Sequence, residues 1–132
     1  MGRQRLTCDE STLHGTYQFV DQGVDSEGNS FAGAGYEYFD GNGNIYGVFS
    51  HHDHGAASAH YLPYNATYTV NADCTGRSIY PVFDSEYDLF IDPHGHRFTW
   101  VLTEPAESEG VSGVEERVTR QRIGILEPLS PG

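Results

Sequence analysis

Residues 114–123, Val-Glu-Glu-Arg-Val-Thr-Arg-Gln-Arg-Ile, carry carboxylate and guanidinium groups along a run that is otherwise typical of a β-strand. Side chains alternate between the two faces of a strand, so Glu116, Arg120 and Arg122 face the interior if Val114 and Val118 do. We predict this register because it buries two valines. A buried charge needs a partner. A Glu116–Arg120 pair would supply a general acid or base and a donor to an oxyanion, so both are candidate catalytic residues.

Two alternatives to this arrangement stay open. The opposite register turns a different set inward, namely Glu115, Arg117, Thr119, Gln121 and Ile123. A charged strand can also belong to a contact between subunits or to a solvated end of a barrel, where surface ion pairs contribute little stability. A homodimer is therefore kept among the expected partners.

Aromatic residues make up 13% of the chain, with 9 Tyr, 7 Phe and 1 Trp, and many fall on alternating positions of short runs. A tyrosine hydroxyl needs a hydrogen-bond partner when it is buried, so several converging tyrosines favour a lined pocket with a few polar groups. A filled core, as in small eight-stranded barrels, is the alternative. Tyr36 is assigned to the catalytic group, and the predicted substrate-binding residues are Tyr17, Phe19, Tyr38, Tyr68, Phe98 and Trp100.

Histidines are concentrated in two short segments that suggest a metal site. His52 and His54 would share one face of a strand, as would His94 and His96, and two such pairs could bind a metal ion. Both pairs fall in predicted loops or hairpin tips, without the neighbouring residues that orient metal ligands. We therefore predict no metal. The sequence has no phosphate-binding loop or dinucleotide fingerprint, so no cofactor is expected.

Eight short runs rich in aromatic and β-branched residues alternate with Gly, Asn, Asp or Pro clusters along the chain. This alternation is typical of all-β antiparallel barrels and sandwiches. Eight strands in so short a chain favour a closed up-and-down β-barrel with a central small-molecule cavity. No segment requires a helix. The predicted strands are residues 14–20, 33–40, 45–50, 63–70, 77–83, 86–91, 97–103 and 114–123.

The length and charge of the chain narrow the function classes. The 132 residues form a single domain, with the barrel at about 13–124 and a flexible tail at 125–132. With 7 Lys+Arg against 19 Asp+Glu, the net charge of −12 argues against nucleic acid and anionic membranes as partners. No run is apolar enough to span a membrane. No apolar signal segment follows Arg3 and Arg5, so the protein is expected to be cytoplasmic.

The state of the two cysteines, Cys8 and Cys74, would indicate whether the protein is cytoplasmic or exported. Cys8 precedes the first predicted strand and Cys74 lies in a predicted hairpin turn, so a disulfide between them would tie the N-terminal arm to the barrel rim. Free thiols are expected in a reducing cytosol, and a disulfide in an exported protein. A secreted mature domain is therefore the alternative to a cytoplasmic protein.

Several motifs resemble those of a group of small microbial proteins. They are Cys8, the Leu-His-Gly-Thr-Tyr run at 13–17, the Asp-Gly-Asn-Gly-Asn turn at 40–44 and the Ala-Thr-Tyr-Thr-Val-Asn-Ala-Asp-Cys-Thr-Gly hairpin at 66–76. Over residues 8–123 the pattern resembles the allene-oxide-cyclase-like barrel superfamily, with Asn65 where Gly is usual. That superfamily includes plant allene oxide cyclases, dirigent proteins and spirotetronate-type cyclases of polyketide biosynthesis. No catalytic residue of these proteins is carried over to this sequence.

The resemblance implies a cofactor-independent cyclase or isomerase that folds an apolar, polyketide-like intermediate in the barrel lumen. Holding a substrate in a near-attack conformation can lower a barrier by many kcal/mol without a conventional catalytic residue. The alternative is a non-enzymatic, lipocalin-like protein that binds a small apolar ligand and is exported with Cys8 and Cys74 bridged. A small apolar molecule is the expected partner in both cases.

Overall fold

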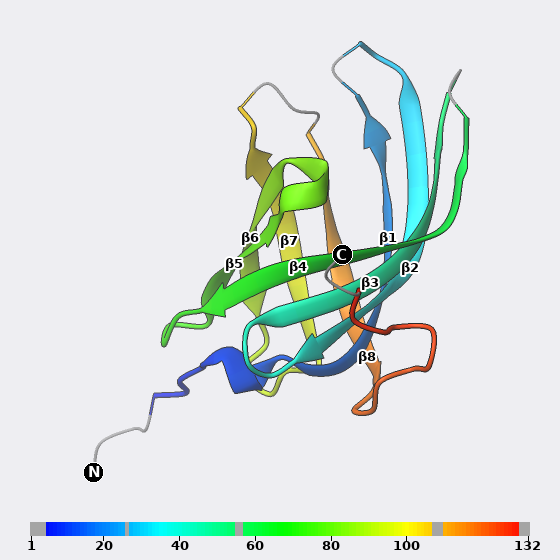
Figure 1. Cartoon of the computed structure of the whole chain (residues 1–132). Helices are drawn as coiled ribbons and strands as arrows, with labels where there is room; N and C mark the ends of the chain where they lie inside the picture. Colours follow the sequence, from blue (N-terminus) through cyan, green and yellow to red (C-terminus); the bar gives the residue numbers. More distant parts are fainter. Residues whose placement is uncertain (1–4, 26, 55–56, 107–109, 130–132) are drawn as a thin grey trace.

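The aromatic and β-branched runs fold into one closed barrel (Figure 1). The computed structural model describes residues 5–25, 27–54, 57–106 and 110–129. Within these residues, eight antiparallel strands pair with their chain neighbours, and the first pairs with the last to close the sheet. The predicted fold is thereby confirmed. The strands are β1 (His14–Val24), β2 (Ser30–Asp40), β3 (Asn44–Asp53), β4 (Ala59–Val70), β5 (Thr75–Tyr80), β6 (Ser85–Ile91), β7 (Arg97–Glu104) and β8 (Ser112–Thr119).

The strands differ from the predicted runs mainly at their ends. The polar residues 21–24 continue the ladder between β1 and β2, so these strands are longer than predicted. Strand β5 ends at Tyr80 because Pro81 has no N–H for the ladder, and Pro81–Phe83 forms a short 3-10 helix, η2. The sequence predicted no long helix, and η2 is a single turn of three residues. None of the helices in the described part of the chain is long and apolar enough to cross a membrane.

One end of the barrel is closed by a plug of side chains under the N-terminal arm. A second 3-10 helix, η1 (Glu10–Thr12), is capped by Asp9. The Tyr68 hydroxyl donates to the backbone oxygens of Glu10 at 2.7 Å and Leu13 at 3.0 Å, which holds the arm against the barrel. The side chains that are almost completely buried in this plug include Leu13, Tyr17, Phe39 and Phe98.

The two ends of the barrel are therefore different. The closed end carries the plug and the β2–β3, β4–β5 and β6–β7 turns. The opposite, open end carries the β1–β2, β3–β4, β5–β6 and β7–β8 connections, which lie at the top of Figure 1. A molecule entering the lumen would have to pass the open end.

A disulfide between Cys8 and Cys74 fixes the arm to the β4–β5 turn. The Cα atoms are 5.0 Å apart and both residues are buried. The Cys8 N–H also donates to the oxygen of Ala72 at 3.1 Å. The bridge that the sequence left open is thus present in the structure, where it secures the plug.

The segment after β8 packs back on the barrel wall. The Thr16 hydroxyl donates to the oxygen of Gln121 at 2.7 Å and accepts the N–H of Ile123 at 3.3 Å. Leu126 is fully buried, and its N–H donates to the oxygen of Ile123 at 2.9 Å. The tail predicted to be flexible from residue 125 is therefore packed at Leu126, while residues 130–132 lie outside the described residues.

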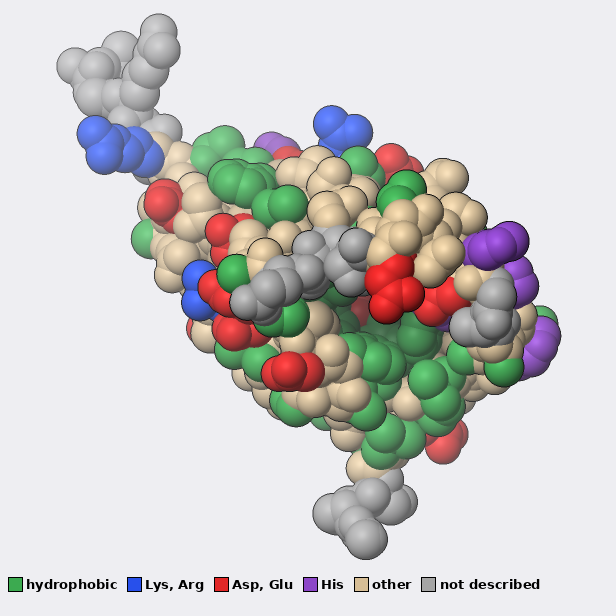
Figure 2. Space-filling model, turned by 90° about the horizontal axis from the view of Figure 1, so that it is seen from above, with side chains coloured by type: hydrophobic (Ala, Val, Ile, Leu, Met, Phe, Trp, Pro, Cys, Tyr) green, Lys and Arg blue, Asp and Glu red, His purple; other side chains and the backbone are tan. Residues whose placement is uncertain are grey.

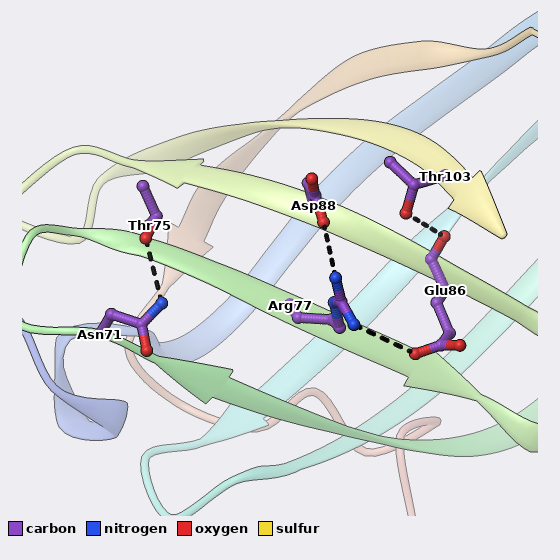
Figure 3. Close-up of polar contacts among 6 residues, drawn as sticks. All are labelled: Asn71, Thr75, Arg77, Glu86, Asp88 and Thr103. Atoms are coloured by element: carbon purple, nitrogen blue, oxygen red, sulfur yellow. Dashed lines mark hydrogen bonds and ion pairs between the residues drawn. The ribbon is translucent and has the colours of Figure 1, made fainter.

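Polar contacts occupy the outer face of β5, β6 and β7 (Figure 3). The Arg77 guanidinium lies 3.7 Å from Glu86 and 3.6 Å from Asp88, and its side chain is 53% exposed. Exposed ion pairs of this kind contribute little to stability. This face of the barrel is ordinary solvated surface.

Candidate functional site

The barrel interior between the plug and the open end holds a cavity of about 550 Å³. This volume falls within the range of about 300–1,000 Å³ that is typical of small-molecule sites. Figure 2 looks down on the open end and shows hydrophobic side chains inside the hollow, with acidic side chains around it. The aromatic rings that line the cavity belong to Phe19, Phe31, Phe49, Tyr64, Tyr80, Phe83, Tyr87, Phe98 and Trp100.

Strand β8 lies in the register opposite to the predicted one. Val114 and Val118 are 43% and 48% exposed, whereas Glu115 is 4% exposed and lines the cavity. Glu115 is paired with Phe19 of β1 and with Phe98 of β7, deep in the wall. The register that was predicted from the two valines is therefore wrong.

The neighbours of Glu115 on the inner face of β8 explain this register. Gly113 lies beside Trp100, and a Cβ at position 113 would overlap the indole. Arg117 lies toward the closed end, where its guanidinium donates to the oxygen of His14 at 3.1 Å and contacts Nδ1 of His96 at 3.3 Å. Packing of the indole and hydrogen bonding at the closed end thus outweigh the burial of two valines.

Glu37 of β2 faces the cavity and is only 1% exposed. Its Oε2 accepts hydrogen bonds from the hydroxyls of Tyr64, at 2.6 Å, and Tyr80, at 2.7 Å. Tyr64 can reach Glu37 across β3 because Gly47 lies between them in the sheet. A Cβ at position 47 would overlap the Tyr64 ring, so the glycine makes room for this contact.

Glu37 and Glu115 form a pair of buried acids, here called the acid pair. The pKa of Glu115 is raised well above its usual 4.5. Burial is the main cause, because it penalises the charged form. The negative charge of Glu37, a hydrogen bond between the two carboxyls and the charge of Asp21 raise the pKa further. Glu115 therefore keeps its proton to higher pH than an exposed glutamate does, which makes it a potential proton donor.

The two tyrosines that hold Glu37 remain hydrogen-bond donors over the same pH range. The pKa values of Tyr64 and Tyr80 are raised well above 10.0, first by burial and then by the negative charge of Glu37. Their hydroxyls consequently stay protonated and fix one oxygen of the Glu37 carboxyl. The other oxygen is left to face the cavity.

Glu37, Glu115 and Trp100 line the cavity, and each has a buried polar atom without a hydrogen-bond partner in the part of the chain that is described. The atoms are Glu37 Oε1, Glu115 Oε2 and Trp100 Nε1. Folded proteins pair the great majority of their buried polar groups, so such atoms require an explanation. Two carboxyl oxygens and one indole N–H are thus available to a bound molecule.

A histidine, His51, and a further acid, Asp84, lie at the rim of the cavity. His51 Nε2 lies 3.5 Å from Asp53 Oδ1, and its ring packs beside Phe49. Asp84 follows η2 with a positive φ of 50° and also lines the cavity. Among the described residues, no three His, Cys, Asp or Glu side chains gather as metal ligands.

The predicted substrate-binding residues divide into three groups. Phe19, Phe98 and Trp100 line the cavity. Tyr17 and Tyr68 point inward but belong to the plug, where the Tyr17 hydroxyl donates to the oxygen of Gly95. Tyr38 points outward and stacks on Tyr46, with the ring centres 6.4 Å apart. Three of the six predicted residues are therefore brought together around the cavity.

The three predicted catalytic residues all lie outside the cavity. Tyr36 shares the outer face of β2 with Tyr38, because the inward position between them is Glu37. Glu116 is exposed on the outer face of β8, and Arg120 is exposed beyond the end of that strand. The register of β8 places Glu116 on the outer face, and the orientation of β2 does the same for Tyr36.

Four residues of the cavity, Glu37, Tyr64, Tyr80 and Glu115, are absent from the predicted set. The sequence does contain a signal for Glu37, because Phe31 and Phe39 share its face of β2 while two tyrosines share the other. Phenylalanine is buried more readily than tyrosine, so the phenylalanine face is the better core face. Tyr64 shares the inner face of β4 with the predicted residue Tyr68, so alternation could have placed it inside. The contacts of Tyr64 and Tyr80 with Glu37 had no local signal, since they form across the barrel.

Comparisons with known proteins identify the fold but no family. No family model matches the chain, and no curated protein does. The solved structure of a redesigned beta barrel, mFAP1, bound to DFHBI, has a TM-score of 0.50 at 18% identity, over 82% of this chain and 97% of that chain. EF1p2_mFAP2b bound to DFHBI has a TM-score of 0.49 at 17% identity, over 80% of this chain and 94% of that chain. A further redesigned beta barrel has a TM-score of 0.48 at 17% identity, over 83% of this chain and 95% of that chain.

Proposed function

We propose that this protein binds one small, largely apolar molecule in the barrel cavity and orients it through the acid pair. The proposal rests on the cavity of about 550 Å³, which has aromatic walls. Within the described residues, these walls also contain buried polar atoms of Glu37, Glu115 and Trp100 that have no hydrogen-bond partner. Apolar walls with a few placed polar groups are typical of ligand sites. The barrel mFAP1, which has a similar fold, is bound to DFHBI, and this also supports ligand binding.

A substitution that fills the cavity is expected to abolish this binding. Ser78 is 2% exposed and lines the cavity, so Ser78→Phe would place a ring in the ligand's space. The neighbouring Ile79 is 39% exposed on the outer face of β5, which makes Ile79→Phe the matched control. Titration of the neutral fluorophore 1-pyrenemethanol should show binding that Ser78→Phe weakens by about tenfold or more. The control should stay within about twofold of the parent.

Two results would contradict ligand binding in the lumen. One is the absence of saturable pyrenemethanol binding to the parent protein, and the other is an equal affinity of the Ser78→Phe variant. Far-ultraviolet circular dichroism establishes that each variant is folded. If Ser78→Phe does not fold, Leu102→Trp fills the cavity nearer the open end, because Leu102 is only half-buried there.

A second candidate function is acid–base catalysis of an isomerisation or ring closure. The observation that favours it is the raised pKa of Glu115 beside the Glu37 carboxyl within one apolar cavity. Two carboxyls in different environments can serve as proton donor and proton acceptor. The resemblance to cyclase barrels is consistent with such a role. In this proposal the acid is Glu115 and the base is Glu37, because Glu116, Arg120 and Tyr36 lie outside the cavity.

The capacity for proton abstraction can be measured without knowing the substrate. The protein is expected to accelerate the base-catalysed ring opening of 5-nitrobenzisoxazole beyond an equal concentration of acetate. Glu37→Gln should lower this rate by about tenfold or more, since a positioned base typically contributes 10²–10⁴-fold. Glu116→Gln removes the same charge from the outer face and should change nothing. A rate equal to that of acetate would refute the catalytic candidate.

A further inference from the structure

The acid pair lacks a cationic partner in the part of the chain that is described. None of the ion pairs found there includes Glu37 or Glu115. The cavity lining contains the further acids Asp21 and Asp84 but no arginine, and the chain contains no lysine. Buried carboxylates are usually paired with a cation or strongly hydrogen-bonded. The positive charge that would match this acidic wall is therefore not supplied by the described residues.

The basic residues nearest to the acid pair in the fold are held elsewhere. Arg117 is two positions from Glu115 on β8, but its guanidinium is held at the closed end by His14 and His96. His51 lines the cavity and pairs with Asp53 at 3.5 Å. Neither side chain therefore reaches Glu37 or Glu115 as an ion-pair partner in the structure.

The walls around Glu37 are suited to a cation as well. The hydroxyls of Tyr64 and Tyr80 point at Glu37 Oε2, and their ring centres are 5.8 Å apart. The two hydroxyls hold Oε2 of the carboxylate in place, and a positive group bonded to Glu37 Oε1 would be attracted by the carboxylate.

The negative net charge of the whole chain also favours a cationic ligand. A net charge of −12 attracts cations and repels anions at long range. Asp84 at the rim and Asp21 in the wall extend this negative potential along the entry path. An anionic ligand would place a further negative charge beside the acid pair, whose existing charges already raise the pKa of Glu115.

We infer that the ligand of this cavity is a protonated amine carried on an apolar, ring-containing body. This inference rests on the proposed ligand-binding function. The ammonium group pairs with Glu37 Oε1 and Glu115 Oε2. The apolar body fills the aromatic part of the cavity toward the open end.

Three probes that share one ring system test this inference. They are 1-pyrenemethylamine, which is cationic, 1-pyrenemethanol, which is neutral, and 1-pyrenecarboxylate, which is anionic. Fluorescence titration near neutral pH is expected to give the amine an affinity about tenfold or more above that of the alcohol, with the carboxylate weakest. Because the ring system is constant, the differences report the charge of the ligand alone.

Substitutions test whether the acid pair causes the preference for the amine probe. A bound ammonium favours the ionised form of both carboxyls. Glu37→Gln and Glu115→Gln therefore each remove one of its negative partners and should reduce the preference for the amine to about twofold or less. The ratio of amine affinity to alcohol affinity is compared within each variant, so a general loss of binding is not counted as a loss of preference. Glu116→Gln removes an equal charge from the outer face of β8, and it should retain the full preference. If Glu37→Gln does not fold, Glu115→Gln alone carries the comparison.

The outcomes separate this inference from the function on which it rests. If none of the probes binds, the proposed ligand-binding function itself fails. If the alcohol binds as tightly as the amine, ligand binding stands and the amine inference is overturned. A preference for the amine that survives in both Gln variants also overturns it, because the net charge of the surface would then explain the selectivity.

Discussion

Replacing Glu115 by Gln is expected to stabilise the protein at about pH 7–8 and to have little effect near about pH 4. The carboxyl is 4% exposed and its pKa is raised well above 4.5, chiefly by burial and then by the charge of Glu37. Glutamine keeps the shape and some of the hydrogen-bonding capacity but never has to lose a proton. The substitution therefore removes a cost that the native side chain imposes on the folded state.

The sign of the pH dependence follows from the raised pKa. In the unfolded chain Glu115 loses its proton near its usual value of 4.5, whereas in the folded protein it keeps the proton to higher pH. Between these two values the unfolded state binds fewer protons, so the free energy of unfolding falls by up to about 1.4 kcal/mol for each unit of rising pH. Well below pH 4.5, Glu115 is protonated in both the folded and the unfolded state, so it adds no pH dependence to the free energy of unfolding.

Urea unfolding of the parent and of Glu115→Gln at several pH values measures this difference. The stability gain should be near zero at about pH 4 and should grow as the pH rises above the usual pKa of 4.5. Glu116→Gln, on the outer face of the same strand, should show no such trend. A gain that is constant with pH, or a loss of stability at neutral pH, would contradict the assignment of a raised pKa to Glu115.

Removing the disulfide is expected to cost about 4 kcal/mol of stability. Cys8 and Cys74 are separated by 66 positions, and a cross-link over so long a loop removes much entropy from the unfolded chain. The bridge also holds the N-terminal arm over the plug, where Tyr68 hydrogen-bonds to Glu10 and Leu13. The double variant Cys8→Ser/Cys74→Ser should therefore unfold at a much lower urea concentration.

Reduction of the parent protein with dithiothreitol provides the internal control, because it breaks the same bond without a substitution. Both samples should lose a similar amount of stability in urea unfolding. A loss below about 1 kcal/mol in both would show that the bridge adds little to the plug.

The barrel could be predicted from the sequence because its signals are local. Turn residues such as the Asp-Gly-Asn-Gly-Asn segment at 40–44 and the alternating runs between them determine where strands begin and reverse. The pairing of Cys8 with Cys74 stayed open in the sequence, because two free thiols in a reducing cytosol also fitted it. Phe19, Phe98 and Trp100 were found because large aromatic side chains in a strand usually face the interior.

Which face of each strand lines the lumen was decided only by tertiary contacts. Alternation fixes that Glu37 opposes Tyr36 and that Glu115 opposes Glu116, but it does not say which member of each pair is inside. Gly47 and Gly113 make room for Tyr64 and Trp100 across the sheet, and this packing selects the inward glutamates. The sequence alone therefore determined the approximate strands and turns, because these depend on neighbours along the chain. Closure was inferred from the count of eight strands, and it depends on the pairing of β1 with β8. The acid pair depends on contacts between β2, β4, β5 and β8, which only the closed barrel brings together.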